Sequence, residues 1–149
     1  MNMKMNREMT LLLQAKGVTW PAHKTFNEKP PNLERVGDCV VLRSEYERNK
    51  HVKVTDLPDR TGFECFINHV HIPFENTKES LIHCLDYVAV LERALISTAL
   101  PGPFRVIVSI ADHNCIVRFH RIRRGEDWID ENLEVYKSEA IMVLDVGTG

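Results

Sequence analysis

The hydrophobic pattern is clearest between Thr77 and Leu100, where apolar residues recur three, four and seven positions apart. This spacing is typical of an α-helix, and the apolar positions cover more than half of its circumference. Asn76 and Glu79 have the spacing of a capping box at its start. The Pro-Gly-Pro run at 101–103 ends it, because proline cannot continue a helix. The pattern therefore predicts a long helix at about 77–100.

Alternating apolar and polar residues predict strands before and after that helix. Helical periodicity is weaker in two other short stretches, at 8–16 and 130–137. A helix this apolar needs a sheet to cover it, so we expect an α+β fold in which an antiparallel or mixed sheet packs on one long central helix. The predicted strands are 38–46, 52–55, 63–72, 104–111, 115–122 and 140–146, with a tight hairpin loop at 112–114.

One domain accounts for the whole chain, because 149 residues are enough for a single hydrophobic core. Residues 1–35 are predicted to form a poorly defined N-terminal arm. Part of this arm should wrap the domain, since Trp20 and Phe26 are costly to leave in water.

Composition and charge exclude some classes of protein. The hydrophobic share of 44% and the charged share of 27% are ordinary for a globular domain. A net charge of −2 argues against a dedicated nucleic-acid binder, which usually has a basic surplus. No apolar run approaches the ~20 residues that cross a bilayer, and no secretory signal is recognisable. We therefore expect a cytoplasmic protein with no membrane partner, and its four cysteines should be reduced and buried.

Two local patterns are candidates for chemistry. His69 and His71 would lie on the same face of a strand, which is a spacing that zinc sites use. Without a second ligand pair nearby, the pattern favours a solvated or partner-facing strand, so no metal or other cofactor is expected. A catalytic cysteine needs a partly exposed thiolate beside a base. Cys65 and Cys115 are predicted in apolar strands and Cys84 in mid-helix, so we expect no catalytic residue and no enzyme.

Charge is concentrated in two adjoining segments near the end of the chain. Residues 118–124 contain Arg118, Arg121, Arg123 and Arg124, a basic strand that a nucleic acid could use or that could be a solvated edge. Between 126 and 145 there are seven acidic residues against Lys137 alone. The two segments could pair internally, or the acidic one could be a docking surface for a basic partner.

Three stretches in this region carry a family resemblance: CIVRFH from residue 115, RGEDW from 124 and NLEVYKSEAI from 132. Together they cover roughly residues 104–146. This part of the chain resembles the C-terminal signature of small bacterial immunity proteins, which sit beside polymorphic toxins of contact-dependent growth inhibition and related systems.

The resemblance implies a cytoplasmic protein that binds and neutralises the toxic C-terminal domain of a cognate effector, often a nuclease. It supplies no catalytic residues, and it implies a protein partner rather than direct binding of nucleic acid. Nuclease toxins need basic surfaces to hold phosphates, so carboxylates are suitable inhibitor groups. Trp128 and Tyr136 are residue types that anchor interfaces, although Trp128 could equally be core. The predicted toxin-binding residues are Glu126, Asp127, Asp130, Glu131 and Glu134. The alternative is a small nucleic-acid-binding or regulatory module that uses the basic strand.

Overall fold

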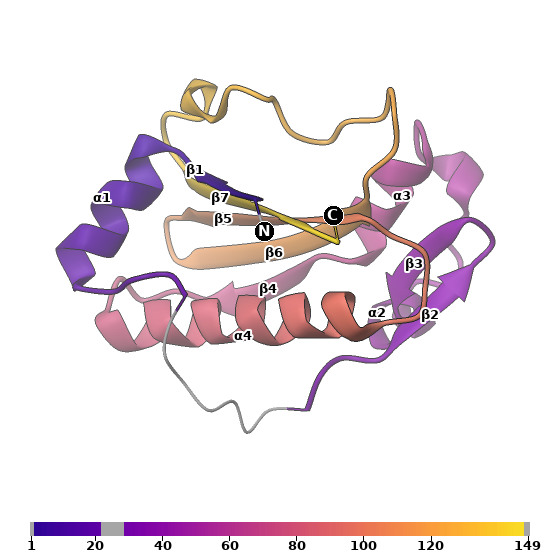
Figure 1. The fold of residues 1–149 in the computed structure, drawn as a ribbon, viewed down its shortest axis with the longest axis horizontal. Helices are drawn as coiled ribbons and strands as arrows, with labels where there is room; N and C mark the ends of the chain where they lie inside the picture. Colours follow the sequence, from indigo (N-terminus) through magenta and orange to yellow (C-terminus); the bar gives the residue numbers. More distant parts are fainter. Residues whose placement is uncertain (1, 22–28, 148–149) are drawn as a thin grey trace.

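The computed structural model describes residues 2–21 and 29–147. Its main feature is a five-stranded antiparallel sheet in the order β1-β7-β5-β6-β4, with the long helix α4 (Lys78–Ser97) packed along one face (Figure 1). The predicted α+β fold with one long helix is confirmed, and the sheet is antiparallel throughout. The strands of this sheet are β1 (Asn2–Met5), β4 (Val70–Pro73), β5 (Phe104–Ala111), β6 (Asn114–Arg121) and β7 (Ala140–Val146).

A smaller layer lies beside the end of the sheet. It consists of the hairpin β2 (Leu33–Val36) and β3 (Cys39–Leu42), the helices α2 (Arg43–Arg48) and α3 (Arg60–Ile67), and the 3-10 turn η1 (Val54–Asp56). Its own buried cluster is Cys39, Val41, Phe63 and Ile67. The neighbouring strand residues Val40 and Leu42 instead join the main core, so this layer is packed onto the sheet.

The two faces of the sheet are covered differently. Val106, Val108, Phe119 and Leu144 are fully buried in the main core that includes α4. On the opposite face Ile107, Ile141 and Val143 are covered by the segment 122–139, which contains the 3-10 turn η2 (Leu133–Val135) (Figure 1). We call this second side the outer face. Both faces of β5 and β7 are therefore buried, which explains their long apolar runs.

The long helix begins close to where its pattern predicts, but its cap is one residue further on. Thr77 Oγ1 accepts a hydrogen bond from the Ser80 amide at 3.1 Å, and Ser80 Oγ accepts from the Thr77 amide at 3.3 Å. Asn76 instead adopts a left-handed backbone conformation with φ 56°. The Asn76–Glu79 capping box is therefore wrong, and Thr77 is the N-cap because its hydroxyl faces the first turn.

The predicted strand at 63–72 is wrong over most of its length. Residues 60–67 form α3, capped by Asp59, whose Oδ1 accepts from the Gly62 amide. Only Val70–Pro73 is a strand. A short apolar run fits both periods. Here the N-cap at Asp59 starts a helix, and Phe63 and Ile67 are buried on it together.

Two earlier strand predictions also need correction. The strand at 38–46 ends at Leu42, and the following α2 consists of polar residues that include an i,i+3 ion pair between Glu45 and Arg48. The predicted return strand at 52–55 is replaced by η1. Neither stretch has the continuous alternation that a longer strand needs.

The helix predicted at 8–16 is confirmed as α1 (Arg7–Lys16), which ends at Gly17 in a left-handed conformation. The helix predicted at 130–137 is reduced to the three residues of η2. The strands β1 and β2 were not predicted; β1 lies in the supposed arm and β2 overlaps its end. Trp20 packs against the main core, whereas Phe26 falls outside the described residues. No helix in the described ranges is long and apolar enough to cross a membrane.

Candidate functional site

The segment 122–139 is held against the outer face by an apolar anchor and by hydrogen bonds. Leu133 is buried, and Ile129 and Tyr136 pack on the same cluster. The Tyr136 hydroxyl accepts from the Asp130 amide at 2.9 Å. Asn6, just before α1, donates its amide Nδ2 to the carbonyls of Tyr136 and Glu139 at 3.1 and 2.8 Å. The segment is therefore an ordered part of the fold.

Two of the five predicted toxin-binding carboxylates, Glu126 and Glu134, accept hydrogen bonds from other parts of the molecule. Glu126 accepts hydrogen bonds from Arg60 Nη2 at 2.9 Å and from the Thr61 amide at 3.1 Å. Burial acts to raise the pKa of Glu126, but the bonds from Arg60 and Thr61 outweigh it and lower that pKa. Both oxygens of Glu134 accept from the Arg7 amide at the start of α1. Both side chains therefore make contacts within the molecule, although Glu134 is exposed.

The other three predicted carboxylates, Asp127, Asp130 and Glu131, are exposed and close together. We call them the acidic rim. Within residues 2–21 and 29–147 no ion pair joins any of them to a basic side chain. The rim borders a cavity of about 280 Å³ between segment 122–139 and the sheet. The remaining lining residues are Lys4, Arg105, Ile129, Leu133 and Val143.

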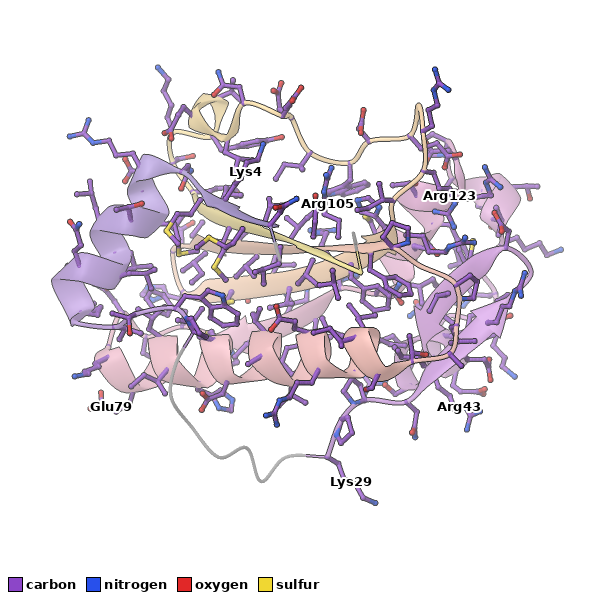
Figure 2. The ribbon with its side chains drawn as sticks, in the orientation of Figure 1. Lys4, Lys29, Arg43, Glu79, Arg105 and Arg123 are labelled. Atoms are coloured by element: carbon purple, nitrogen blue, oxygen red, sulfur yellow. The ribbon has the colours of Figure 1, made fainter. Side chains whose placement is uncertain are left out.

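Lys4 and Arg105, which the sequence did not single out, are the basic residues of this cavity (Figure 2). Arg105 binds Asp145 through two hydrogen bonds of 2.7 and 2.9 Å. These bonds raise the pKa of Arg105 against the opposing effect of burial, and the charges of Asp127 and Glu131 add to the rise. Lys4 Nζ donates to the carbonyl oxygen of Glu131 at 3.2 Å. Arg105 is thus neutralised by Asp145, and the three rim carboxylates outnumber Lys4.

Trp128 adjoins the rim and is 44% exposed, so it is not a core residue. The Arg118 guanidinium lies 5.0 Å from its ring centroid, at a distance typical of a cation–π contact. A large aromatic side chain held in this way can present its free face to a partner with little loss of side-chain entropy.

Most arginine side chains of the basic strand make contacts inside the molecule. Glu64 of α3 is fully buried and accepts from Arg123 Nη1 at 2.6 Å, while Arg121 Nη1 donates to Asp38 at 2.8 Å. Of the four arginines only Arg124 is exposed, because Arg118 is partly covered as well. Arg121 and Arg123 form ion pairs with Asp38 and Glu64. The Glu126 side chain of the acidic segment acts on Arg123 only through its charge. We call Asp38, Arg60, Glu64, Arg121, Arg123 and Glu126 the ion cluster.

Glu64 on α3 and Asn68, the C-cap residue of this helix, also connect main chains of two different layers. Glu64 accepts from the amides of Val40 at 2.7 Å and Arg121 at 2.9 Å. Asn68 accepts from the Leu42 amide at 2.8 Å and donates to the carbonyls of Val40 and Phe119. The two side chains thus satisfy backbone groups where β3 passes beside β6.

The two histidines of the HxH pattern have ring centroids 5.1 Å apart. Only His71 lies on a strand, because β4 begins at Val70 and His69 precedes it. His69 Nδ1 contacts the Phe66 carbonyl, and His71 Nδ1 contacts Asn114 Nδ2. In the described part of the chain no group of three or more His, Cys, Asp or Glu side chains is arranged to hold a metal ion.

The four cysteines are buried and reduced. Burial raises the pKa of Cys39 to about 11 and raises that of Cys65 further. Cys84 and Cys115 meet in the core, where their hydrogen bond raises the pKa of Cys115. Cys65 lies in α3, so its predicted strand position is wrong, although it is buried as expected. The same hydrogen bond lowers the pKa of Cys84, but this thiol is fully buried in the core, whereas a nucleophilic cysteine is partly exposed.

A family model matches residues 1–148, nearly the whole chain. The chain belongs to the uncharacterized protein PM0498 family. No curated protein matches it, and no solved structure does. The family membership covers both the acidic segment and the N-terminal strand that supplies Lys4.

Proposed function

We propose that this member of the PM0498 family is an immunity protein, which binds and neutralises the toxic C-terminal domain of a cognate bacterial effector in the cytoplasm. The toxin is a nuclease, and the protein itself performs no reaction. The observation that supports this function is the acidic rim beside the exposed Trp128, on a segment that the fold holds in place.

Charge complementarity supports a basic partner. A nuclease holds phosphates with lysines and arginines, and three carboxylates without internal ion pairs can contact those groups. Long-range attraction between the two surfaces would speed their encounter. Trp128 supplies the apolar anchor that a charged surface alone lacks, because aromatic residues contribute most to the centre of interfaces.

The first experiment is co-expression with the toxin-like reading frame adjacent to the gene, followed by pull-down and a growth-protection assay. We expect a stable complex and rescue of growth. If the neighbouring toxin kills with the protein present and no complex forms, the proposed function is wrong. Turnover of RNA or DNA by the purified protein alone would contradict it as well.

The second experiment locates the binding surface. Asp127→Lys with Glu131→Lys should slow association and make it less sensitive to salt, because steering is screened beyond ~8 Å at physiological salt. Complex stability should fall by roughly 2–5 kcal/mol if the reversed pair lies at the centre of the interface. Charge reversal of Arg118 and Arg121 should matter less for binding.

The matched control makes the same change of charge elsewhere. Glu75→Lys with Glu79→Lys alters two exposed residues, one just before α4 and one in its first turn. Glu79 lies on the α4 side of the sheet, away from the rim (Figure 2). This control variant should protect cells from the toxin as well as the unchanged protein does. Equal protection and equal association rates for both double variants, in folded proteins, would place the docking surface outside the rim.

A further inference from the structure

The strand β1 forms one edge of the sheet. Among the described residues it pairs with β7 alone, over Asn2–Met5. The amide of Asn6 donates to the Ile141 carbonyl at 3.0 Å, which sets the alternation of the antiparallel ladder. In an antiparallel ladder every second residue bonds the neighbouring strand, so Lys4 and Asn2, two and four positions before Asn6, also direct their backbone groups toward β7. The amide and carbonyl of Met3 and Met5 therefore point away from the sheet.

A hollow runs beside this edge and continues beneath the acidic rim. The cavity of about 280 Å³ under the rim shares Lys4, Arg105 and Val143 with a second cavity of about 500 Å³. The second cavity is also lined by Asn2, Met3 and Asp145. The open backbone edge and the charged hollow are therefore adjacent parts of one surface.

The chemistry of the hollow suits a long basic side chain. Ile129, Leu133 and Val143 offer apolar surface to an aliphatic stem, and the rim carboxylates lie where its charged head would be. Asp145 is already matched by Arg105 at 2.7 Å. The three rim carboxylates therefore leave an excess of negative charge around the cavity.

We propose that an extended basic segment of the partner protein adds to the sheet as a sixth strand, antiparallel or parallel to β1. Its backbone bonds the outward groups of Met3 and Met5, and one of its lysine or arginine side chains enters the cavity under the rim. Main-chain hydrogen bonds supply affinity and the cavity supplies selectivity for a cation, as in other cases of strand addition. The nature of the partner as a toxin rests on the proposed function, whereas the edge and the hollow do not.

The test removes one outward-facing amide without touching the β1–β7 ladder. Met3→Pro lacks that donor, and proline is tolerated on an edge strand whose amide faces solvent. Met3→Val is the matched control, since it also changes the side chain but keeps the amide. Affinity for the partner should fall about tenfold in Met3→Pro, because one hydrogen bond is lost and the added strand is slightly misaligned. Affinity should be unchanged in Met3→Val. Thermal melting of both variants checks that they fold.

A probe peptide separates this inference from the proposed function. Acetyl-Lys-Val-Lys-Val-Lys-Val-amide should bind the unchanged protein and shift the NMR amide signals of Met3 and Met5. The same peptide with glutamate in place of lysine should not bind. Binding of the lysine peptide should weaken in Met3→Pro and in Asp127→Lys with Glu131→Lys.

The outcomes are distinct. Equal binding of peptide and partner by Met3→Pro and Met3→Val would overturn strand addition, even if the immunity function holds. Peptide binding that depends on the Met3 amide, with no binding of the toxin domain, would support the edge and reject the immunity function. A dimer in sedimentation that Met3→Pro dissociates would instead assign the edge to a second copy and overturn the proposal.

Discussion

The ion cluster and the acidic rim are both rich in carboxylates, and they follow one another along segment 122–139, the cluster ending at Glu126 and the rim beginning at Asp127. In the ion cluster the fully buried Glu64 accepts hydrogen bonds from Val40, Arg121 and Arg123. In the rim, Asp127 and Glu131 are exposed and have no such partners among the described residues. The same chemical group therefore stabilises the fold in the cluster and is available to a partner in the rim.

The contrast shows why a count of acidic residues cannot locate a binding surface. Glu126 and Asp127 are neighbours in sequence, but Glu126 bonds Arg60 while Asp127 borders the cavity. A buried charge is costly unless it is matched, so cluster residues should be intolerant of change. Exposed rim residues should be free to vary without loss of stability. Four predictions test this division.

The largest effect is expected for Glu64→Ala. The substitution leaves the buried Arg123 guanidinium without its 2.6 Å partner and leaves two backbone amides unbonded. The free energy of unfolding should fall by roughly 3–5 kcal/mol, as measured by urea denaturation. Glu131→Ala is the control and should change it by less than about 0.5 kcal/mol. Similar values for the two variants would remove the distinction between cluster and rim.

A smaller loss is expected for Asn68→Ala. This change removes one acceptor and two donor contacts between α3, β3 and β6, and unsatisfied buried groups remain. The cost should be roughly 2–3 kcal/mol, again by urea denaturation. Asn114→Ala, whose side chain contacts the exposed His71, should cost much less. If Asn68→Ala were as mild as this control, the junction of the two layers would not depend on the side-chain bonds.

The third prediction concerns acid. The hydrogen bond from Arg121 lowers the pKa of Asp38 below its ordinary value of 3.8, and Arg60 and Arg123 add to this effect. A lowered folded-state pKa stabilises the fold above the ordinary value, and that contribution disappears as the pH falls through the lowered one. Asp38→Asn should therefore reduce stability at neutral pH and flatten its decline below pH 3.8.

Unfolding curves of Asp38→Asn recorded between about pH 7 and pH 3 measure this slope. Asp127→Asn is the matched rim variant and should keep the slope of the unchanged protein. A steeper decline in Asp38→Asn than in the unchanged protein would contradict the assignment of acid sensitivity to the ion cluster.

The smallest effect on stability is expected for Asp127→Lys with Glu131→Lys. Both residues are exposed and make no side-chain ion pair within the described ranges, so the free energy of unfolding should change by less than about 0.5 kcal/mol per site. Thermal and urea unfolding measure it. A loss comparable to that of Glu64→Ala would show that the rim also holds the fold together, and reduced binding could then not be attributed to a lost contact.

The elements with long, regular patterns could be predicted from sequence. The helix at 78–97 and the strands at 104–111 and 140–146 have apolar spacing that local physics alone decides. The helix α3 could not, because its apolar residues at 63, 65, 66 and 67 fit a strand as well. The missed signal was at the start of the helix: Asp59 follows Pro58 and caps the first turn by accepting a hydrogen bond from the Gly62 amide.

The candidate surface was only partly predictable, for a related reason. The rim carboxylates are close in sequence, so a local excess of charge indicated them. Lys4 and Arg105 reach the same cavity only because β1 and β5 both pair with β7, which is a long-range event. The partners of Arg121 and Arg123 likewise come from β3, α3 and their connections. Local sequence cannot distinguish a basic strand that is free from one that is neutralised by distant residues.

The position of β7 has a consequence for how the chain folds. Among the described strands it comes last in sequence, but it lies between β1 and β5 in the sheet. During synthesis β5 and β6 can form their hairpin early, whereas β1 has no strand to pair with until β7 emerges from the ribosome. Pairing between the two ends of a chain is slow because a long loop must close first. We therefore expect a nascent state in which the β5 edge is open, and hence a period of vulnerability to aggregation that ends when the last strand inserts.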